Sequence, residues 1–166
     1  GVYFVPLADD TNVDQFTSRV AQQLEVREGG RPLLENIQDY LRDKRMLLVL
    51  DNFEQLVSAA PAVADLLAAA PQLKIITSSR IALQLHGEHE YPVPPLDLPQ
   101  SNEATIEELA GNESVNLFVE RARASNPNFA LTKDNASSIA DICRRLDGLP
   151  LALELAAARI KLLPPQ

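Results

Sequence analysis

The chain has few of the residues on which several classes of protein depend. It contains one cysteine, Cys143, and no tryptophan among 166 residues. A single cysteine excludes an internal disulfide and a cysteine-rich zinc site, in line with a reducing compartment. Because Cys143 lies within an apolar helical pattern, we expect it to be a core residue rather than a catalytic one.

Long apolar runs are also missing. No stretch approaches the roughly 18 apolar residues needed to span a bilayer, and the N-terminus lacks the basic region of a secretory signal. These absences predict a cytoplasmic chain with no membrane contact.

Basic residues are too few for a nucleic-acid-binding surface. The 15 Lys and Arg residues are outnumbered by 23 Asp and Glu residues, which gives a net charge of −8. Binding to a phosphate backbone requires clustered Lys and Arg. We therefore expect no direct nucleic-acid contact by this chain.

The phosphate-binding pattern G-x-x-x-x-G-K-[ST] does not occur in the sequence. In that pattern, backbone N–H groups surround the phosphates and the lysine reaches the β- and γ-phosphates. The paired glycines Gly29 and Gly30 precede Arg31 and Pro32, and we expect them in a loop between helices.

What is present begins with an alternation of strand and helix patterns. Residues 2–7, 46–50 and 73–77 are rich in strand formers, and apolar residues at three- and four-residue steps predict helices between them. Those helical positions are Val13, Phe16, Val20 and Leu24, then Leu33, Leu34, Ile37, Tyr40 and Leu41, and a stretch after Asp51 that breaks at Pro61. Strands separated by helices indicate right-handed crossovers and a parallel sheet.

The second half contains only helical patterns. A proline-rich connector, residues 91–99, separates the halves, so we predict an α/β domain over residues 1–95 and a helical subdomain over 96–166. The expected inward positions are Val115, Phe118, Val119 and Ala122, then Ile139, Ala140, Cys143 and Leu146 after a Thr132 cap, and finally Leu151, Leu155, Ala158 and Leu162 in a helix beginning at Pro150.

An acidic residue ends the most apolar strand. Met46 to Leu50 is a continuous apolar run typical of a strand buried on both faces, and Asp51 follows it directly. Ligands of parallel sheets bind beyond the carboxyl ends of the strands, where Asp51 would hold Mg²⁺ through its water shell, as a Walker B acid does. The alternative is an ordinary core strand that ends in an Asp-Asn turn.

A second strand end carries hydroxyls and a guanidinium. Thr77, Ser78 and Arg80 come at the end of the strand 73–77 or just after it, beside the expected place of Asp51. Arginine donors match phosphate oxygens, so Arg80 is a candidate for reading a terminal phosphate. The alternative is a solvated arginine in a turn.

Two further clusters have simpler interpretations. Gly148 and Pro150 are typical of the end of one helix and the start of the next. His86 and His89 have a His-x-x-His spacing without a helical pattern, so we favour a turn in a β-hairpin over a zinc site.

Three motifs in order carry a family resemblance. Residues 47–54 (LLVLDNFE), 75–80 (IITSSR) and 148–151 (GLPL) resemble, in that order and at those intervals, the NB-ARC-like branch of STAND signal-transduction ATPases, in the variety found in large multidomain bacterial transcription regulators. The resemblance implies an incomplete P-loop NTPase core, without its first strand and phosphate loop, followed by the small helical subdomain.

The resemblance also implies roles for individual residues. Asp51 would bind Mg²⁺ through water, and Glu54, or alternatively Asn52, would orient the attacking water. Arg80 would read the γ-phosphate, with Thr77 and Ser78 lining the same strand end. In the Gly148-Leu149-Pro150 segment, Pro150 would pack against adenine. ATP, ADP and Mg²⁺ would be the ligands of a slow switch ATPase that also contacts other domains of its own protein.

The missing first strand raises a physical problem. In the family this first strand lies between two others, which correspond here to residues 46–50, followed by Asp51, and residues 73–77, followed by Arg80. Its loss would leave these two buried strands with unpaired backbone groups. We expect either that residues 46–50 pair directly with 73–77, or that two chains exchange strands as a dimer. This chain alone should bind nucleotide poorly; the alternative function is a non-enzymatic protein-interaction module of the same fold.

Overall fold

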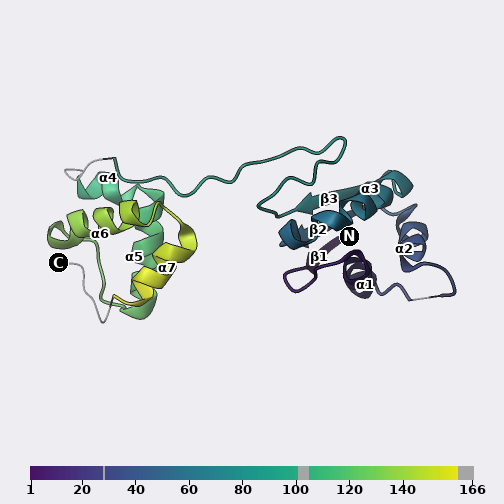
Figure 1. Ribbon diagram of the computed structural model, residues 1–166. Helices are drawn as coiled ribbons and strands as arrows, with labels where there is room; N and C mark the ends of the chain where they lie inside the picture. The colour runs from purple at the N-terminus through teal and green to yellow at the C-terminus, as the bar shows by residue number, and fades with distance from the viewer. Residues whose placement is uncertain (28, 101–104, 161–166) are drawn as a thin grey trace. The chain divides into compact units, whose positions relative to one another are not determined.

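The chain divides into two structural units near Tyr91. The computed structural model describes residues 1–27, 29–100 and 105–160. One unit comprises Gly1–Tyr91 and the other Pro92–Gln166. The first combines a three-stranded parallel sheet with helices, and the described part of the second contains helices alone (Figure 1). No helix of the described residues has the length and apolar character needed to cross a membrane.

The strands of the first unit lie side by side in chain order. They are β1 (Val2–Pro6), β2 (Met46–Asp51) and β3 (Leu73–Thr77), all parallel, in the order β1-β2-β3. Met46 lies opposite Leu73 and Leu50 lies opposite Thr77. Of the two arrangements expected from the sequence, direct pairing or an exchange of strands between chains, the structure shows direct pairing, and the backbone groups between these strands are satisfied within one chain.

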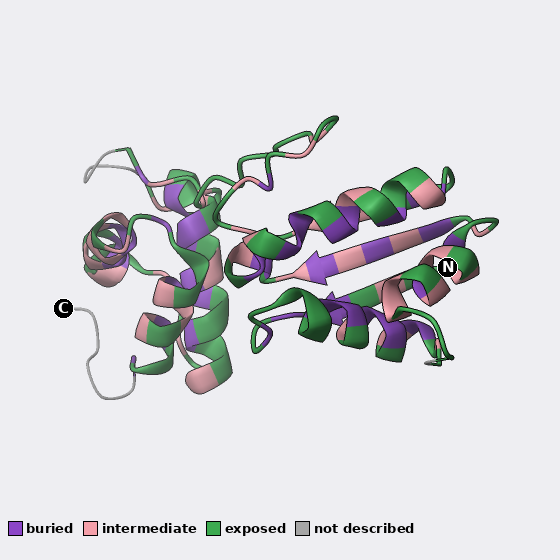
Figure 2. Cartoon of the chain, turned by 45° about the vertical axis from the view of Figure 1, so that its right-hand side comes forward, coloured by how far each residue is buried: buried purple, intermediate pink, exposed green. Residues whose placement is uncertain are grey.

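Three helices cover one face of the sheet. They are α1 (Val13–Leu24), α2 (Leu33–Leu41) and α3 (Ala60–Ala69); α3 follows the short 3-10 turns Phe53–Gln55 and Val57–Ala59 and has Pro61 in its first turn. Helix α2 contacts both α1 and α3, and the buried residues of the helices face the sheet (Figure 2). Val5, Leu48 and Leu50 meet them from the sheet in one core. Both crossovers move in the same direction along the sheet, and right-handed crossovers then place every helix on the same side.

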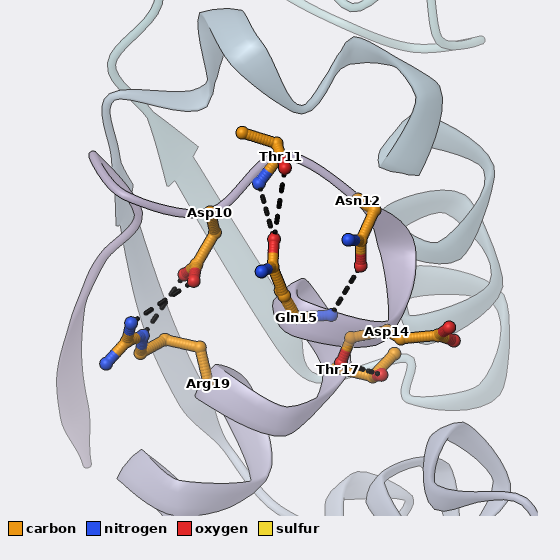
Figure 3. A network of polar contacts seen from close by, with 7 residues as sticks. All are labelled: Asp10, Thr11, Asn12, Asp14, Gln15, Thr17 and Arg19. Carbon is orange, nitrogen blue, oxygen red and sulfur yellow. Dashed lines mark hydrogen bonds and ion pairs between the residues drawn. The ribbon is translucent and has the colours of Figure 1, made fainter.

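Local capping explains where α1 begins. Asn12 is the N-cap and its side chain accepts a hydrogen bond from Gln15 N at 2.9 Å. The Gln15 side chain in turn accepts hydrogen bonds from the backbone and hydroxyl of Thr11 (Figure 3). These bonds satisfy N–H groups that have no partner within the helix.

The second unit is a small helical bundle. Its helices are α4 (Ile106–Ala110), α5 (Glu113–Ser125), α6 (Lys133–Arg145) and α7 (Pro150–Ala158). The predicted stripe of α5 is buried, as are Ile139, Ala140 and Cys143 of α6, whereas the predicted Leu146 is only half-buried. Thr132 caps α6 as expected, and its N–H donates to the side chain of Asn135 at 2.8 Å. Burial raises the pKa of the Cys143 thiol, which fits a core residue.

The inward face of α7 differs from the prediction. Leu151, Leu155 and Ala158 are exposed, while Leu153 and Ala157 pack inward; Leu162 lies outside the described residues. Nearly every position of this helix is apolar, so hydrophobic periodicity does not specify which face is buried.

The expected β-hairpin around His86 is also not formed. Residues 86 and 87 make a turn, but the chain on either side of it, within the described range 78–100, is irregular. The Glu88 carboxylate accepts hydrogen bonds from Leu83 N at 2.9 Å and Leu85 N at 3.1 Å. These backbone groups are thus bound by a side chain rather than by a partner strand.

The turn at Glu88 should depend on pH. The bonds from Leu83 and Leu85 favour the ionised carboxylate, and they lower the pKa of Glu88 despite the opposing effect of its slight burial. The stabilisation is therefore complete above the unfolded-state pKa and is lost as the pH falls through the lower folded value. We expect the amide signals of Leu83 and Leu85 to shift below about pH 4 in NMR spectra. Glu88→Gln should abolish that shift, and a transition that survives the substitution would contradict this assignment.

Gly148 meets a steric requirement between α6 and α7. Its φ is +65°, its N–H donates to Cys143 O at 3.2 Å, and its carbonyl accepts from Leu96 N at 3.1 Å. A Cβ at this position would lie 2.3 Å from the Leu96 carbonyl oxygen. The left-handed conformation and this close backbone approach both favour glycine.

Gly148→Ala should therefore destabilise the helical unit. We expect a loss of about 1–3 kcal/mol in the free energy of unfolding, measured by urea denaturation. Gly111→Ala is the matched control, because Gly111 has right-handed helical φ and ψ and a Cβ there would make ordinary contacts of 3.5 Å. Equal effects of the two substitutions would contradict the steric requirement.

Candidate functional site

The ends of β2 and β3 are joined by Ser78. Its hydroxyl donates to Asp51 Oδ1 at 2.5 Å and accepts from Asn52 N at 3.0 Å. Its backbone N–H donates to Leu50 O at 2.9 Å, and its carbonyl accepts from Phe53 N at 3.0 Å. Four hydrogen bonds from one residue thus fix the chain after β2 against the chain after β3. We call residues 51–54 and 77–80 the rim.

A buried ring anchors the turn that follows Asp51. Asn52 adopts a left-handed conformation with φ of 63°, which asparagine tolerates better than most residues. The turn places Phe53 in the core, fully buried and edge-to-face with Phe16 at 5.7 Å between ring centroids. With Phe53 pointing into the core, Glu54 lies at the rim beside the end of β3.

Glu54 and Arg80 form an ion pair across the rim. Arg80 Nε lies 3.0 Å from Glu54 Oε1, and the two side chains are 82% and 14% exposed, respectively. Within the described part of the chain the pair uses only Nε of the guanidinium. The terminal nitrogens of this exposed side chain therefore remain available to another acceptor.

The carboxyl end of β1 lies at the same end of the sheet as the rim. Leu7 N donates to Asp51 O at 3.0 Å. The buried Asp10 in the following loop makes a two-pronged ion pair with Arg19 of α1, each contact 3.1 Å long (Figure 3). This hydrogen bond and the charge of Asp10 raise the pKa of Arg19. Sequence analysis did not identify the pair, because residues nine positions apart across a loop and a helix leave no periodic signal.

The structure brings together four of the residues selected from the sequence. They lie at the rim as two pairs, in which Ser78 contacts Asp51 and Arg80 contacts Glu54. Two carboxylates and one guanidinium leave an excess negative charge. Carboxylate oxygens are the kind of ligand that hard divalent cations take, but among the described residues no group of three or more acidic, histidine or cysteine side chains assembles at the rim.

The side chains of the other selected residues lie away from Asp51, although Thr77 itself belongs to the rim. Thr77 ends β3 and, by the alternation of the strand, belongs to the helix-covered face rather than beside Asp51. Gly148 and Pro150 lie in the helical unit, at the turn before α7 and in its first position. His86 and His89 gain no further metal ligand in the described ranges, where no group of three or more acidic, histidine or cysteine side chains assembles.

A shallow hollow lies at the opposite end of the sheet from the rim. It is lined by residues from the amino ends of the strands and the segments before them, namely Gly1, Val2, Arg45, Met46, Leu47, Pro71, Gln72 and Lys74. It contains none of the carboxylates or hydroxyls that would act on a substrate. The carboxylates and the hydroxyl that could act on a ligand are therefore at the rim, the opposite end of the sheet.

Substitutions at the rim should show which residues stabilise the fold and which do not. Phe53→Ala should lower the free energy of unfolding by about 3–5 kcal/mol, because it empties a buried position. Arg80→Ala should change it by less than about 1 kcal/mol, since exposed ion pairs contribute little. Urea denaturation of both variants checks this contrast. A large loss of stability in Arg80→Ala would mean that the ion pair is structural.

Comparison with known proteins identifies relatives but no family. No family profile matches the chain. A Mycobacterium tuberculosis protein named "Putative HTH-type transcriptional regulator" and its Mycobacterium bovis counterpart are each 35% identical over 99% of this chain and 18% of their own length. An M. tuberculosis protein named only as uncharacterized is 42% identical over 82% of this chain and 32% of its own length. The chain thus spans less than a third of the curated relatives that it matches.

Proposed function

We propose that this chain is part of an ATP- and ADP-binding regulatory switch of the NB-ARC-like STAND type, and that the switch acts in the regulation of transcription. The observation that carries the proposal is the rim, where Ser78 holds Asp51 and Arg80 contacts Glu54. The names of two relatives support the regulatory part. Because the chain is acidic, any DNA contact would be made by another part of such a protein.

In this proposal each rim residue has a separate task. Asp51 holds Mg²⁺ through water by the carboxylate oxygen that Ser78 does not bind. Arg80 offers its terminal nitrogens to the γ-phosphate, because guanidinium donors match phosphate oxygens. Glu54, positioned by Phe53, orients the attacking water. Phosphoryl transfer requires positioning and charge stabilisation rather than covalent chemistry, so these groups are of the right kind.

The ion pair explains why hydrolysis would be slow. While Glu54 binds Arg80, part of the acceptor capacity of the carboxylate is occupied and the charge of the guanidinium is partly neutralised. A phosphate that draws Arg80 away would free Glu54 for water. A site with such competing contacts suits a switch that holds nucleotide as a signal.

A second candidate is a protein-interaction module that never binds nucleotide. The observation that favours it is the absence of the G-x-x-x-x-G-K-[ST] pattern from residues 1–166. If the encoded sequence shortly before Gly1 contains that pattern, the switch gains support; otherwise the interaction module does.

Calorimetry with MgATP and MgADP tests the switch. We expect negligible heat with the 166-residue chain and binding with a longer form that extends upstream through a first strand and phosphate loop. In that longer form Arg80→Ala should weaken MgATP by about 10- to 100-fold and MgADP by much less, since charge-assisted hydrogen bonds contribute about 1.5–3 kcal/mol. Pro150→Ala should weaken both nucleotides if Pro150 contacts adenine, as the resemblance implies.

Arg42→Ala is the control for the loss of a surface arginine. Arg42 pairs with Asp39 at the end of α2, before the amino end of β2, and its side chain is mostly exposed, 61% against 82% for Arg80. It should leave both affinities unchanged. If the longer form bound neither MgATP nor MgADP, the result would contradict the switch proposal and favour the interaction module.

A further inference from the structure

Asn52 has an unusual backbone conformation in the middle of the rim. Its φ is 63° and its ψ is 50°, in the left-handed region. Two of the other three non-glycine residues with positive φ in the described ranges, Glu25 and Asp147, lie at the ends of α1 and α6, where left-handed residues are common. Asn52 instead follows the last residue of β2, so the end of a helix does not account for its conformation.

The amide group of Asn52 does not hold this conformation. An asparagine side chain can stabilise a left-handed backbone by bonding to nearby backbone groups. Within the part of the chain that the structure describes, the exposed Asn52 side chain makes no such bond. The backbone is held instead by Ser78, whose hydroxyl accepts from Asn52 N and whose carbonyl accepts from Phe53 N, each at 3.0 Å. A strained backbone persists where its surroundings fix it in this way, and such positions cluster at functional sites.

The left-handed residue separates two parts of the rim. Asp51 comes before it, as the last residue of β2. Glu54 comes two residues after it, and the direction of the chain between them decides whether Phe53 enters the core and Glu54 meets Arg80. A different backbone conformation at position 52 would therefore move Glu54 away from Arg80 and leave Asp51 at the end of its strand.

We propose that Asn52 is a positioning residue, which sets Glu54 against Arg80 through its left-handed backbone and not through its amide group. Orientation of the attacking water is thereby assigned to Glu54, and Asn52 has no direct contact with that water. The use of Glu54 in hydrolysis rests on the proposed switch function, whereas the role of Asn52 in placing Glu54 does not.

Glycine and alanine at position 52 distinguish a backbone role from a side-chain role. Both substitutions delete the amide group. Glycine adopts the left-handed conformation readily, whereas the Cβ of alanine disfavours it. A backbone role predicts that Asn52→Gly behaves like the native chain and that Asn52→Ala does not. A side-chain role predicts that both variants lose function.

Hydrogen exchange in the 166-residue chain tests the geometry without nucleotide. The Phe53 N–H, which donates to Ser78 O, reports directly on the conformation of position 52. We expect it to exchange at least about tenfold faster in Asn52→Ala, because the turn opens more easily, and within about threefold of the native rate in Asn52→Gly. The NMR signal of the Arg80 Nε–H should shift toward that of a free guanidinium in Asn52→Ala alone.

The longer, nucleotide-binding form tests the consequence for hydrolysis. Asn52→Ala should lower kcat for ATP hydrolysis by about 10- to 100-fold, because a small misplacement of one orienting group is costly. It should change the Kd of MgATP by less than about threefold, since Asp51 precedes position 52 and Arg80 follows another strand. Asn52→Gly should leave kcat within about threefold of the native value.

Ile37→Val is the control for lost stability. Ile37 is fully buried in α2 of the same unit and lies outside the rim, so its shortening weakens the core without changing position 52. It should leave the Arg80 signal and kcat unchanged.

Two outcomes would overturn the proposal. Equal loss of kcat in Asn52→Ala and Asn52→Gly, with native exchange of Phe53 in the glycine variant, would show that the amide group itself acts on the water. Native exchange of Phe53 in Asn52→Ala would show that the left-handed backbone is not what places Glu54. If the exchange and the Arg80 signal change as expected but the longer form binds no nucleotide, the positioning role stands and only the switch proposal fails.

Discussion

The direct pairing of β2 with β3 is the constraint on which the rest of the first unit depends. In this register Ser78 lies next to Asp51 and bonds to both sides of the turn after β2. A shift by one residue would turn the side chains of β2 to the opposite face and separate these groups. The same alternation of side chains along β2 builds both the core and the rim. It buries Leu48 and Leu50 under the helices and places Asp51 on the face of the sheet that these helices do not cover.

The rim combines a carboxylate next to a buried ring with an exposed arginine. Phe53 has no exposed surface and holds Glu54 in place, whereas Arg80 is mostly in solvent and touches the rim through one nitrogen. In the proposed switch a phosphate would have to displace only Arg80, because the buried Phe53 holds Glu54 and the Arg80 side chain is exposed. Asp10 and Arg19 form a second ion pair in the neighbouring loop, in which the carboxylate is buried.

Much of the fold was predictable because its signals are local. Hydrophobic periodicity predicted the strands of the described residues to within one residue, and it predicted the helices of the first unit. The need to pair buried backbone groups left two alternatives, direct pairing of residues 46–50 with 73–77 or strand exchange between chains, and the structure shows the first. The face of α7 was not predictable, because Leu151 and Leu153 are equally apolar. The Glu54 to Arg80 contact was not predictable either, although both residues were selected, because it depends on the left-handed turn at Asn52.

Paramagnetic broadening tests the proposed location of the nucleotide site most directly. Mn²⁺ replaces Mg²⁺ with ATP in the longer, nucleotide-binding form, and the amide signals that broaden first mark the residues nearest the metal. Binding at the rim predicts early loss of the signals of residues 51–54 and 77–80, while those of Arg45 and Gln72 at the opposite end of the sheet stay sharp. Early broadening at Arg45 and Gln72, with a sharp signal from Asp51, would contradict a metal and phosphate site at the rim.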